Sequence, residues 1–175
     1  MNNQISHHEI RLRHIQETSN IRGEMVGETL EELEADFWGE PEFDSRLEKI
    51  CHQLRKKPVH RFTAEDLRIM IGQNIGLAYL IPEALNKLRK QPLISGNLYE
   101  GDLLNTLISS EWVKTGTYSN LNTLLVKLCR AAMAQLENSH TSHLTQDTDH
   151  TENNPFKSTI PYRDFAEFCR NAEKT

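Results

Sequence analysis

Apolar residues in the centre of the chain recur at helical spacing. The clearest stripe predicts a helix from about Ser119 to Glu137 and consists of Leu121, Leu124, Leu125, Leu128, Ala131, Ala132 and Leu136. Shorter stripes of the same period predict further helices, and no segment has the alternation of a half-buried strand. The predicted fold class is therefore all-α, a compact single-domain helical bundle.

Polar residues before three of these stripes indicate where helices begin. A Ser or Thr is followed three residues later by an acid in the pairs Thr29–Glu32, Ser45–Glu48 and Thr63–Asp66. The first pair predicts a helix over 29–36. The second predicts a helix that is capped by Asp44 or Ser45 and ends before Pro58. Their neighbours predict the buried faces: Leu47, Ile50, Cys51 and Leu54 after Ser45, and Leu67, Met70 and Ile71 after Thr63.

Glycines and prolines divide the rest of the chain. Gly72 and Gly76 predict a tight connection, and Pro82 predicts the first turn of a helix that runs to Lys90 with Leu85 and Leu88 inward. Asp102 and Pro161 each begin a further predicted helix. Their inner faces are Leu103, Leu104, Leu107 and Ile108 in the first, and Phe165, Phe168 and Cys169 in the second.

Two polar stretches set the predicted domain boundaries. Residues 1–22 contain few apolar anchors and are expected to be loosely held. Residues 138–158 are rich in Ser, Thr, His, Asp and Asn, so they bury too little surface to offset the entropy of ordering. We expect a helical domain over 23–137, a flexible polar linker over 138–158 and a C-terminal helix within 159–175.

Charge and cysteine content narrow the class of protein. The formal net charge is −5, which disfavours nucleic acid as the main ligand, because phosphate binding requires a basic surface. The 3 cysteines are far apart and odd in number, which favours a reducing compartment. No apolar run is long enough for a membrane helix, and the N-terminal residues do not have the pattern of a signal peptide. Together these features predict a cytoplasmic protein.

Catalytic and metal-binding patterns are weak. Cys51 and His52 are adjacent, so on a helix they point about 100° apart and do not form a nucleophile–base pair. His140 and His143 have metal-ligand spacing, with His150 nearby, but lie in the polar stretch without a carboxylate or cysteine held beside them. No glycine-rich phosphate loop is present. We predict no catalytic residues, no metal and no cofactor, which leaves a binding role.

A DNA-binding regulator is the alternative. The segment from Thr63 to Lys90 has two predicted helices joined by a glycine-containing turn, as in helix-turn-helix proteins. However, no arginine or lysine lies between Gln73 and Asn86, so the second helix lacks groups that contact phosphates.

Acidic residues are concentrated near the N-terminal third of the chain. The stretch from Glu24 to Glu48, the acidic arm, holds 10 of the 25 acidic residues, and Arg46 is its only basic one. Phe37, Trp38 and Phe43 are interleaved with the acids. Acidic side chains around aromatic ones can attract and hold a basic protein.

The order of short motifs resembles the immunity proteins of bacterial contact-dependent growth inhibition (CDI) systems. The resemblance covers about residues 30–110. It rests on the runs Phe37-Trp38-Gly39-Glu40-Pro41, Cys51-His52-x-Leu54-Arg55-Lys56-Lys57-Pro58, Phe62-Thr63-x-Glu65-Asp66-Leu67-Arg68-x-Met70-Ile71-Gly72-Gln73, Ile75-Gly76-Leu77-x-Tyr79-Leu80-Ile81-Pro82, Pro92-Leu93 and Tyr99-x-Gly101-Asp102-Leu103-Leu104.

The resemblance implies a protein that binds the C-terminal toxin domain delivered by a neighbouring cell and neutralises it in a 1:1 complex. Such toxins are often nucleases. An RNase would have a basic cleft that an acidic protein can cover. The motif residues themselves, Trp38 and Pro82 among them, are expected to determine the fold. The expected toxin contacts are Glu31, Glu32, Glu34, Asp36, Glu40, Glu42 and Asp44, with Tyr99, Glu100 and Asp102 as a second patch.

Overall fold

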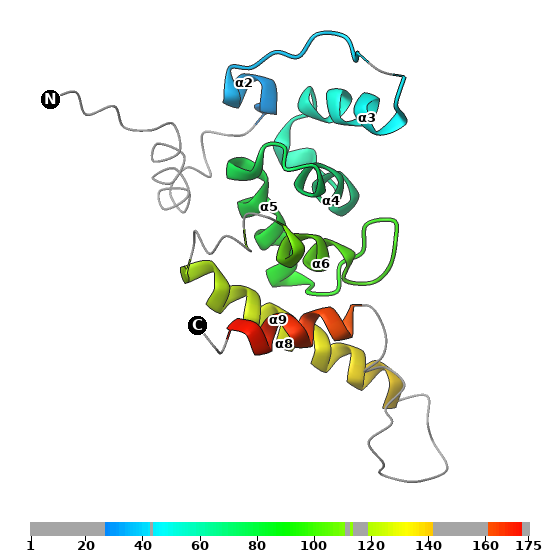
Figure 1. Ribbon diagram of the computed structural model, residues 1–175, viewed down its shortest axis with the longest axis vertical. Helices are drawn as coiled ribbons and strands as arrows, with labels where there is room; N and C mark the ends of the chain where they lie inside the picture. Colours follow the sequence, from blue (N-terminus) through cyan, green and yellow to red (C-terminus); the bar gives the residue numbers. More distant parts are fainter. Residues whose placement is uncertain (1–26, 43, 111–112, 114–118, 142–160, 173–175) are drawn as a thin grey trace, which may run out of the picture. The chain divides into compact units, whose positions relative to one another are not determined.

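The computed structural model describes residues 27–42, 44–110, 113, 119–141 and 161–172. These residues form seven α-helices and one short 3-10 helix, without a β-strand, so the predicted all-α class is confirmed (Figure 1). The chain divides into two compact units, Met1–Asn86 and Lys87–Thr175, and the division falls inside helix α5. Residues 1–22 and most of the predicted linker lie outside the described residues. The predicted domain boundaries therefore stay predictions.

The described part of the first unit contains helix α2 (Leu30–Glu34), whose predicted capping box is present. The Thr29 hydroxyl accepts the Glu32 N–H, and the Glu32 carboxylate accepts the Thr29 N–H at 2.8 Å. The Thr29 N–H and the Thr29 hydroxyl both donate to the Glu32 carboxylate, and these two hydrogen bonds lower the pKa of Glu32. A helix of 5 residues is hardly stable by itself. Its position therefore depends on the fully buried Leu30 and on an isolated β-bridge between Thr29 and Pro58.

Helix α3 (Arg46–Arg55) differs from its prediction at its first turn. Ser45 occupies the N-cap position, but its side chain makes no capping hydrogen bond. Glu48 instead accepts the Glu42 N–H at 2.9 Å, so the predicted capping box is wrong: the preceding loop uses the carboxylate. The buried residues, Cys51 and Leu54 among them, lie in the last two turns. Leu47 is 41% exposed, which contradicts its predicted burial.

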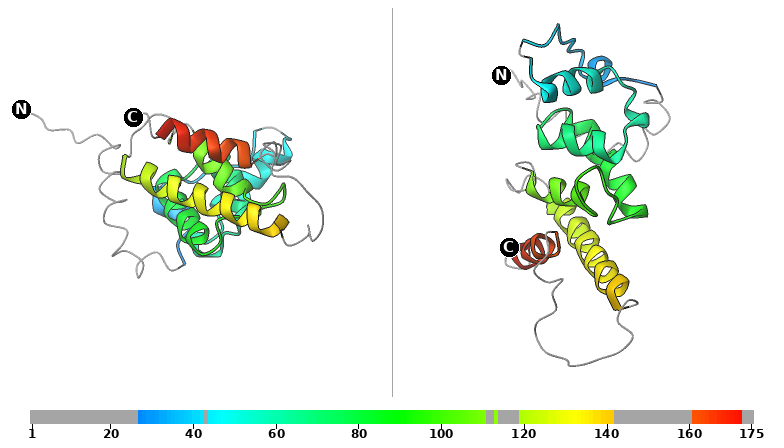
Figure 2. Two further views of the ribbon diagram at one scale, coloured as in Figure 1. Left: turned by 90° about the horizontal axis from the view of Figure 1, so that it is seen from below. Right: turned by 90° about the vertical axis from the view of Figure 1, so that its right-hand side faces the viewer.

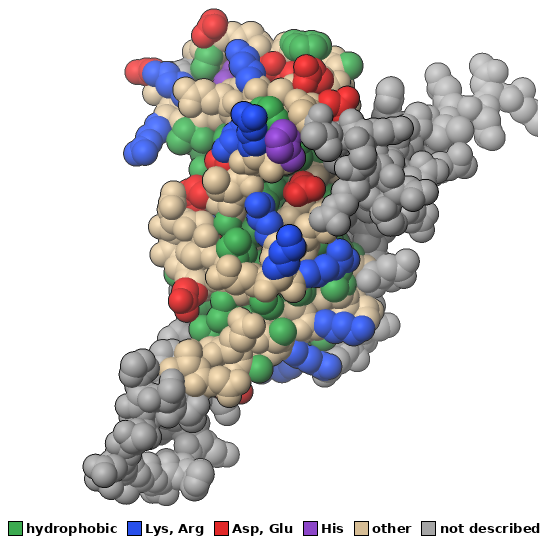
Figure 3. Space-filling model, turned by 180° about the vertical axis from the view of Figure 1, so that it is seen from behind, with side chains coloured by type: hydrophobic (Ala, Val, Ile, Leu, Met, Phe, Trp, Pro, Cys, Tyr) green, Lys and Arg blue, Asp and Glu red, His purple; other side chains and the backbone are tan. Residues whose placement is uncertain are grey.

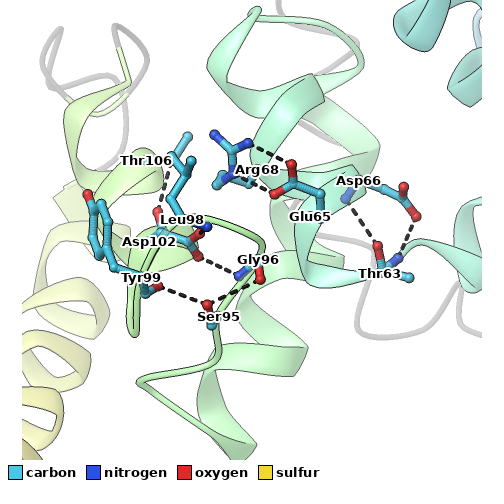
Figure 4. A network of polar contacts seen from close by, with 10 residues as sticks. All are labelled: Thr63, Glu65, Asp66, Arg68, Ser95, Gly96, Leu98, Tyr99, Asp102 and Thr106. Carbon is cyan, nitrogen blue, oxygen red and sulfur yellow. Dashed lines mark hydrogen bonds and ion pairs between the residues drawn. The ribbon is translucent and has the colours of Figure 1, made fainter.

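A 3-10 turn, η2 (Val59–Arg61), leads into helix α4 (Ala64–Gly72). The predicted capping box of α4 is present: the Thr63 hydroxyl accepts the Asp66 N–H, and Asp66 accepts the Thr63 N–H at 2.7 Å (Figure 4). The predicted inner face is confirmed, since Leu67, Met70 and Ile71 are fully buried. The helix ends at Gly72, where the sequence predicts an interruption.

Helix α5 (Leu77–Lys90) begins earlier than predicted, and Pro82 lies inside it rather than in its first turn. Gly76, with φ at +64°, makes the turn that starts the helix, and its carbonyl accepts the N–H groups of Tyr79 and Leu80 at 3.0 Å. An interior proline costs about 3 kcal/mol because it removes a hydrogen bond and crowds the preceding turn. Burial of Leu80 and Ile81 just before it offsets that cost.

The second unit contains helices α6 (Asp102–Ser109), α8 (Ser119–Thr141) and α9 (Tyr162–Ala172). The predicted inner face of α6 is buried, as are Leu125, Leu128, Ala132 and Leu136 of the long stripe. Ala131 is exposed, because the buried face of α8 is narrower than the stripe. Helix α8 also continues to Thr141, past the predicted end at Glu137 and into the start of the predicted linker.

The C-terminal helix α9 packs against α8, as Figures 1 and 2 both show. Phe165 is fully buried, and the Cys169 thiol lies 3.9 Å from the Val126 carbonyl oxygen. The Tyr162 hydroxyl donates to Glu137 at 2.6 Å, which raises the pKa of Tyr162 to about 12. The predicted C-terminal helix is thus an integral part of its unit. Among the described residues, no helix has the length and apolarity required to cross a bilayer.

Candidate functional site

The described part of the acidic arm runs from α2 through an irregular loop, residues 36–42, to α3 (Figure 1). The chain leaves α2 through Ala35, which has φ at 51° in the left-handed region. The Asp36 N–H donates back to the Glu31 carbonyl at 3.1 Å, so the end of α2 is closed by backbone hydrogen bonds. This reversal directs the loop back across the first unit towards α3.

Arg55, at the end of α3, holds the loop in place. Its side chain is only 1% exposed. One guanidinium nitrogen donates to the Glu34 carboxylate at 2.5 Å, and the other donates to the Asp36 carbonyl at 2.6 Å and to the Asp36 carboxylate at 3.3 Å. A buried guanidinium requires such partners because removing an ion from water is costly. Arg55 therefore connects α2, the loop and α3.

Trp38 and His52 complete the attachment of the loop. The Trp38 ring lies 4.3 Å from the Arg55 guanidinium carbon, and its indole N–H donates to Asp36 at 3.0 Å. The rings of Trp38 and His52 meet edge to face with centroids 5.0 Å apart. His52 Nδ1 also lies 3.0 Å from the Gly39 carbonyl oxygen. Trp38 thus stabilises the fold, as the sequence predicts.

The predicted contact residues of the arm divide into two groups. Glu31 is buried, and Glu34 is largely covered and bound to Arg55, so neither carboxylate lies free on the surface. Figure 3 shows acidic side chains near α2 and α3, beside lysines and arginines. The exposed members are Glu32, Asp36, Glu40, Glu42 and Asp44. Arg55 holds the backbone at Asp36, His52 holds it at Gly39, and Glu48 accepts the N–H of Glu42.

The second predicted patch lies in the other unit, around the loop before α6. Asp102 is only 1% exposed, and its carboxylate accepts the N–H groups of Gly96 at 2.6 Å and Leu98 at 3.0 Å (Figure 4). Asp102 therefore shapes the loop from within. Tyr99 is half-buried and its hydroxyl accepts from Asn105 at 2.7 Å, whereas Glu100 is exposed.

The weak catalytic pattern at Cys51 and His52 is not a nucleophile–base pair. Cys51 is buried, and this burial, together with the charge of Glu48, raises the pKa of its thiol. His52 contacts the arm loop instead. The described residues contain no group of three or more His, Cys, Asp or Glu side chains that could hold a metal ion. The side chains of His140, His143 and His150 lie outside the described residues.

Sequence reasoning missed the central role of Arg55. From the sequence, the basic run Arg55-Lys56-Lys57 suits the C-terminus of a helix, and this pattern alone predicts no contact between Arg55 and the arm. One signal was present: Arg55 follows Cys51 by four residues, so the two side chains share a face of α3. An arginine on the apolar face of a helix is seldom buried without a charged partner, so its place there indicates a buried ion pair with an acidic residue elsewhere in the chain.

Comparison with known families agrees with this architecture. The model of the family described as CDI immunity proteins matches residues 32–125, which is more than half of the chain. The match spans the end of α2, the whole arm loop, helices α3 to α6 and the first part of α8. No curated protein and no solved structure matches the chain. The chain belongs to the family of CDI immunity proteins.

Proposed function

We propose that this protein binds the C-terminal toxin domain of its own CDI effector in a 1:1 complex and blocks it without catalysing a reaction. The binding takes place in the cytoplasm of the cell that makes both proteins. The favoured toxin is an RNase, because a nuclease that binds a polyanion requires a basic cleft. The acidic arm covers that cleft or its rim.

The observation that carries the proposal is the exposed acidic surface of the arm. Glu32, Asp36, Glu40, Glu42 and Asp44 are exposed, and the buried Arg55 fixes this segment at Glu34, Asp36 and Trp38. Charges on an ordered surface attract a basic partner over a distance of about one Debye length, roughly 10 Å at 0.1 M salt. Glu31, Glu34 and Asp102 are left out of the proposed contacts because their side chains are buried or largely covered.

Charge also differs between the two units. Residues 1–86 carry 15 acidic and 10 basic side chains, whereas residues 87–175 carry 10 of each. The whole formal charge of −5 therefore resides in the unit that contains the arm. Tyr99 and Glu100 are proposed as a separate second contact.

The test compares two double charge reversals. Glu40→Lys with Glu42→Lys changes two exposed side chains of the arm. Glu83→Lys with Glu167→Lys changes the net charge equally, on α5 and α9, and is the matched control. The partner is the toxin domain encoded directly upstream, made inactive by substitution. Its association rate constant is measured by stopped-flow at salt concentrations from about 25 to about 500 mM, over which the screening of charges changes strongly.

We expect the arm variant to associate roughly 10-fold or more slowly at low salt, and to lose most of its salt dependence. The control should retain both the rate and the salt slope to within about 2-fold. Equal slowing in both variants would mean that only net charge matters and would remove the arm from the proposal. Absence of any complex with wild-type protein, or tight binding to mixed DNA at low salt, would contradict the immunity function itself.

A further inference from the structure

Among the described residues of the acidic arm, Phe37 is the most exposed large apolar side chain. It is 70% exposed, although both neighbours, Asp36 and Trp38, are fixed by contacts with Arg55. A single exposed apolar residue is ordinary on a protein surface. The position of Phe37 is unusual, because this residue lies on the short segment that the buried Arg55 guanidinium holds.

The backbone on both sides of Phe37 has defined partners. Before it, the Asp36 carbonyl accepts from Arg55 at 2.6 Å. After it, the Trp38 ring packs against Arg55 and His52, and the Gly39 carbonyl oxygen lies 3.0 Å from His52 Nδ1. A side chain on such a backbone loses little conformational freedom when a partner covers it. Phe37 is therefore preorganised for binding rather than for packing within its own chain.

The surroundings of Phe37 indicate the chemistry of the partner. Asp36, Glu40 and Glu42 are exposed on the same loop. Protein interfaces commonly have an aromatic centre that loses its water and a charged rim that remains partly solvated. An aromatic residue with an acidic rim complements an apolar pocket bordered by lysines and arginines.

We infer that Phe37 is the apolar anchor of the toxin complex and inserts into a pocket of the toxin domain beside its basic surface. This inference rests on the proposed function and deepens it, because it assigns steering and retention to different residues. The exposed acids govern how fast the complex forms. Phe37 governs how long it lasts, and Arg55 acts as a positioning residue that keeps Phe37 outward.

The test uses Phe37→Ala, Phe37→Leu and Leu98→Ala in the full-length protein. Leu98 is a stringent control, since it is 64% exposed on a loop that the buried Asp102 holds and it borders the proposed second contact of Tyr99 and Glu100. It shows whether any exposed apolar side chain beside a proposed contact has the same effect as Phe37. Association and dissociation rates with the inactivated toxin domain encoded upstream are measured by surface plasmon resonance. Circular dichroism and thermal unfolding check that each variant folds like wild type.

We expect Phe37→Ala to bind roughly 30-fold or more weakly, with most of the change in the dissociation rate. Phe37→Leu should recover a large part of the affinity, and Leu98→Ala should stay within about 3-fold of wild type. The inference is wrong if Phe37→Ala binds within about 3-fold of wild type, or if Leu98→Ala loses as much affinity as Phe37→Ala. Either result would leave the immunity function intact. If the wild-type protein forms no complex with the toxin domain, both the proposed function and the role of Phe37 are wrong.

Discussion

At the scale of single residues, buried and half-buried charges define the loops of this protein. Arg55 in the first unit and Asp102 in the second are each 1% exposed, and each binds the backbone of a neighbouring loop. Neither could be recognised from composition, because a sequence gives a residue's type but not its partners. For Arg55, the partners Glu34 and Asp36 come from 21 and 19 residues earlier in the chain.

The pH dependence of stability tests the contribution of one such half-buried charge, Asp66. Burial by itself would raise the pKa of Asp66, but hydrogen bonds from Lys57 and from the backbone and side chain of Thr63 lower it below the usual 3.8. A carboxyl group with a lower pKa in the folded state stabilises the fold above its unfolded pKa. That contribution disappears as the pH falls through the folded pKa.

We therefore expect Asp66→Asn to lower the free energy of unfolding by about 1 kcal/mol at pH 7, as for loss of a helix cap. The difference from wild type should shrink when urea unfolding is repeated below about pH 4. Asp44→Asn is the control: Asp44 pairs with Lys49 on an exposed surface, so its removal should change stability little. A difference for Asp66→Asn that stays constant from pH 7 to pH 3 would exclude the proposed linkage.

At the scale of helices, predictions from capping hydrogen bonds and from the spacing of apolar residues were correct where the interacting residues are close in sequence. The capping boxes at Thr29 and Thr63 formed as expected, since both partners lie within one turn. The box at Ser45 did not form, because the Glu42 N–H binds Glu48 instead. Pro82 was misplaced for a related reason: tertiary burial of the residues before it outweighs the local preference of proline.

Gly76, between α4 and α5, tests how closely the helices of the first unit approach one another. A Cβ atom there would come within 2.7 Å of Leu30 Cδ1, and φ at +64° is unfavourable for any residue with a side chain. Gly76→Ala should therefore destabilise the protein by about 2–3 kcal/mol. Chemical unfolding monitored by circular dichroism measures this directly.

Gly39→Ala is the control for Gly76→Ala. A Cβ atom at Gly39 would meet nothing within 4 Å, so this variant should stay within about 0.5 kcal/mol of wild type. Should Gly76→Ala be as stable as Gly39→Ala, the close packing of Leu30 against this turn would be wrong.

At the scale of the whole molecule, the three cysteines behave as core residues. Cys51, Cys129 and Cys169 are all buried and free. Burial raises the pKa of the Cys51 and Cys129 thiols, which keeps both in the protonated and unreactive form. The sequence predicted this for Cys51 from its place on an apolar stripe, and the same reasoning holds for Cys129, which follows Leu125 by four residues.

We expect native protein to react slowly with a thiol reagent such as Ellman's reagent at pH 8, and to release 3 equivalents rapidly in guanidinium chloride. The slow phase reports opening of the fold, so it should accelerate in Gly76→Ala. A thiol that reacts at once in native protein would contradict the packing around that cysteine.

The sequence predicted that the candidate site is acidic, but it did not predict the geometry of the site. The acidic arm is visible in the sequence, as is its resemblance to immunity proteins. Which acids face outward could not be predicted. The irregular loop has no period from which to assign faces, and Arg55 withdraws Glu34 from the surface through a contact that is distant in sequence.

The attachment of the arm loop to Arg55 has a consequence for how pairs of such proteins can diverge. The groups that fix the loop, Arg55, Trp38 and His52, are different from those that would meet a partner, such as Phe37 and Glu40. Substitutions at the outward positions leave the supporting contacts unchanged, so one scaffold can present many different surfaces. A new toxin variant could then be matched by one or two outward replacements, without a compensating change in the core.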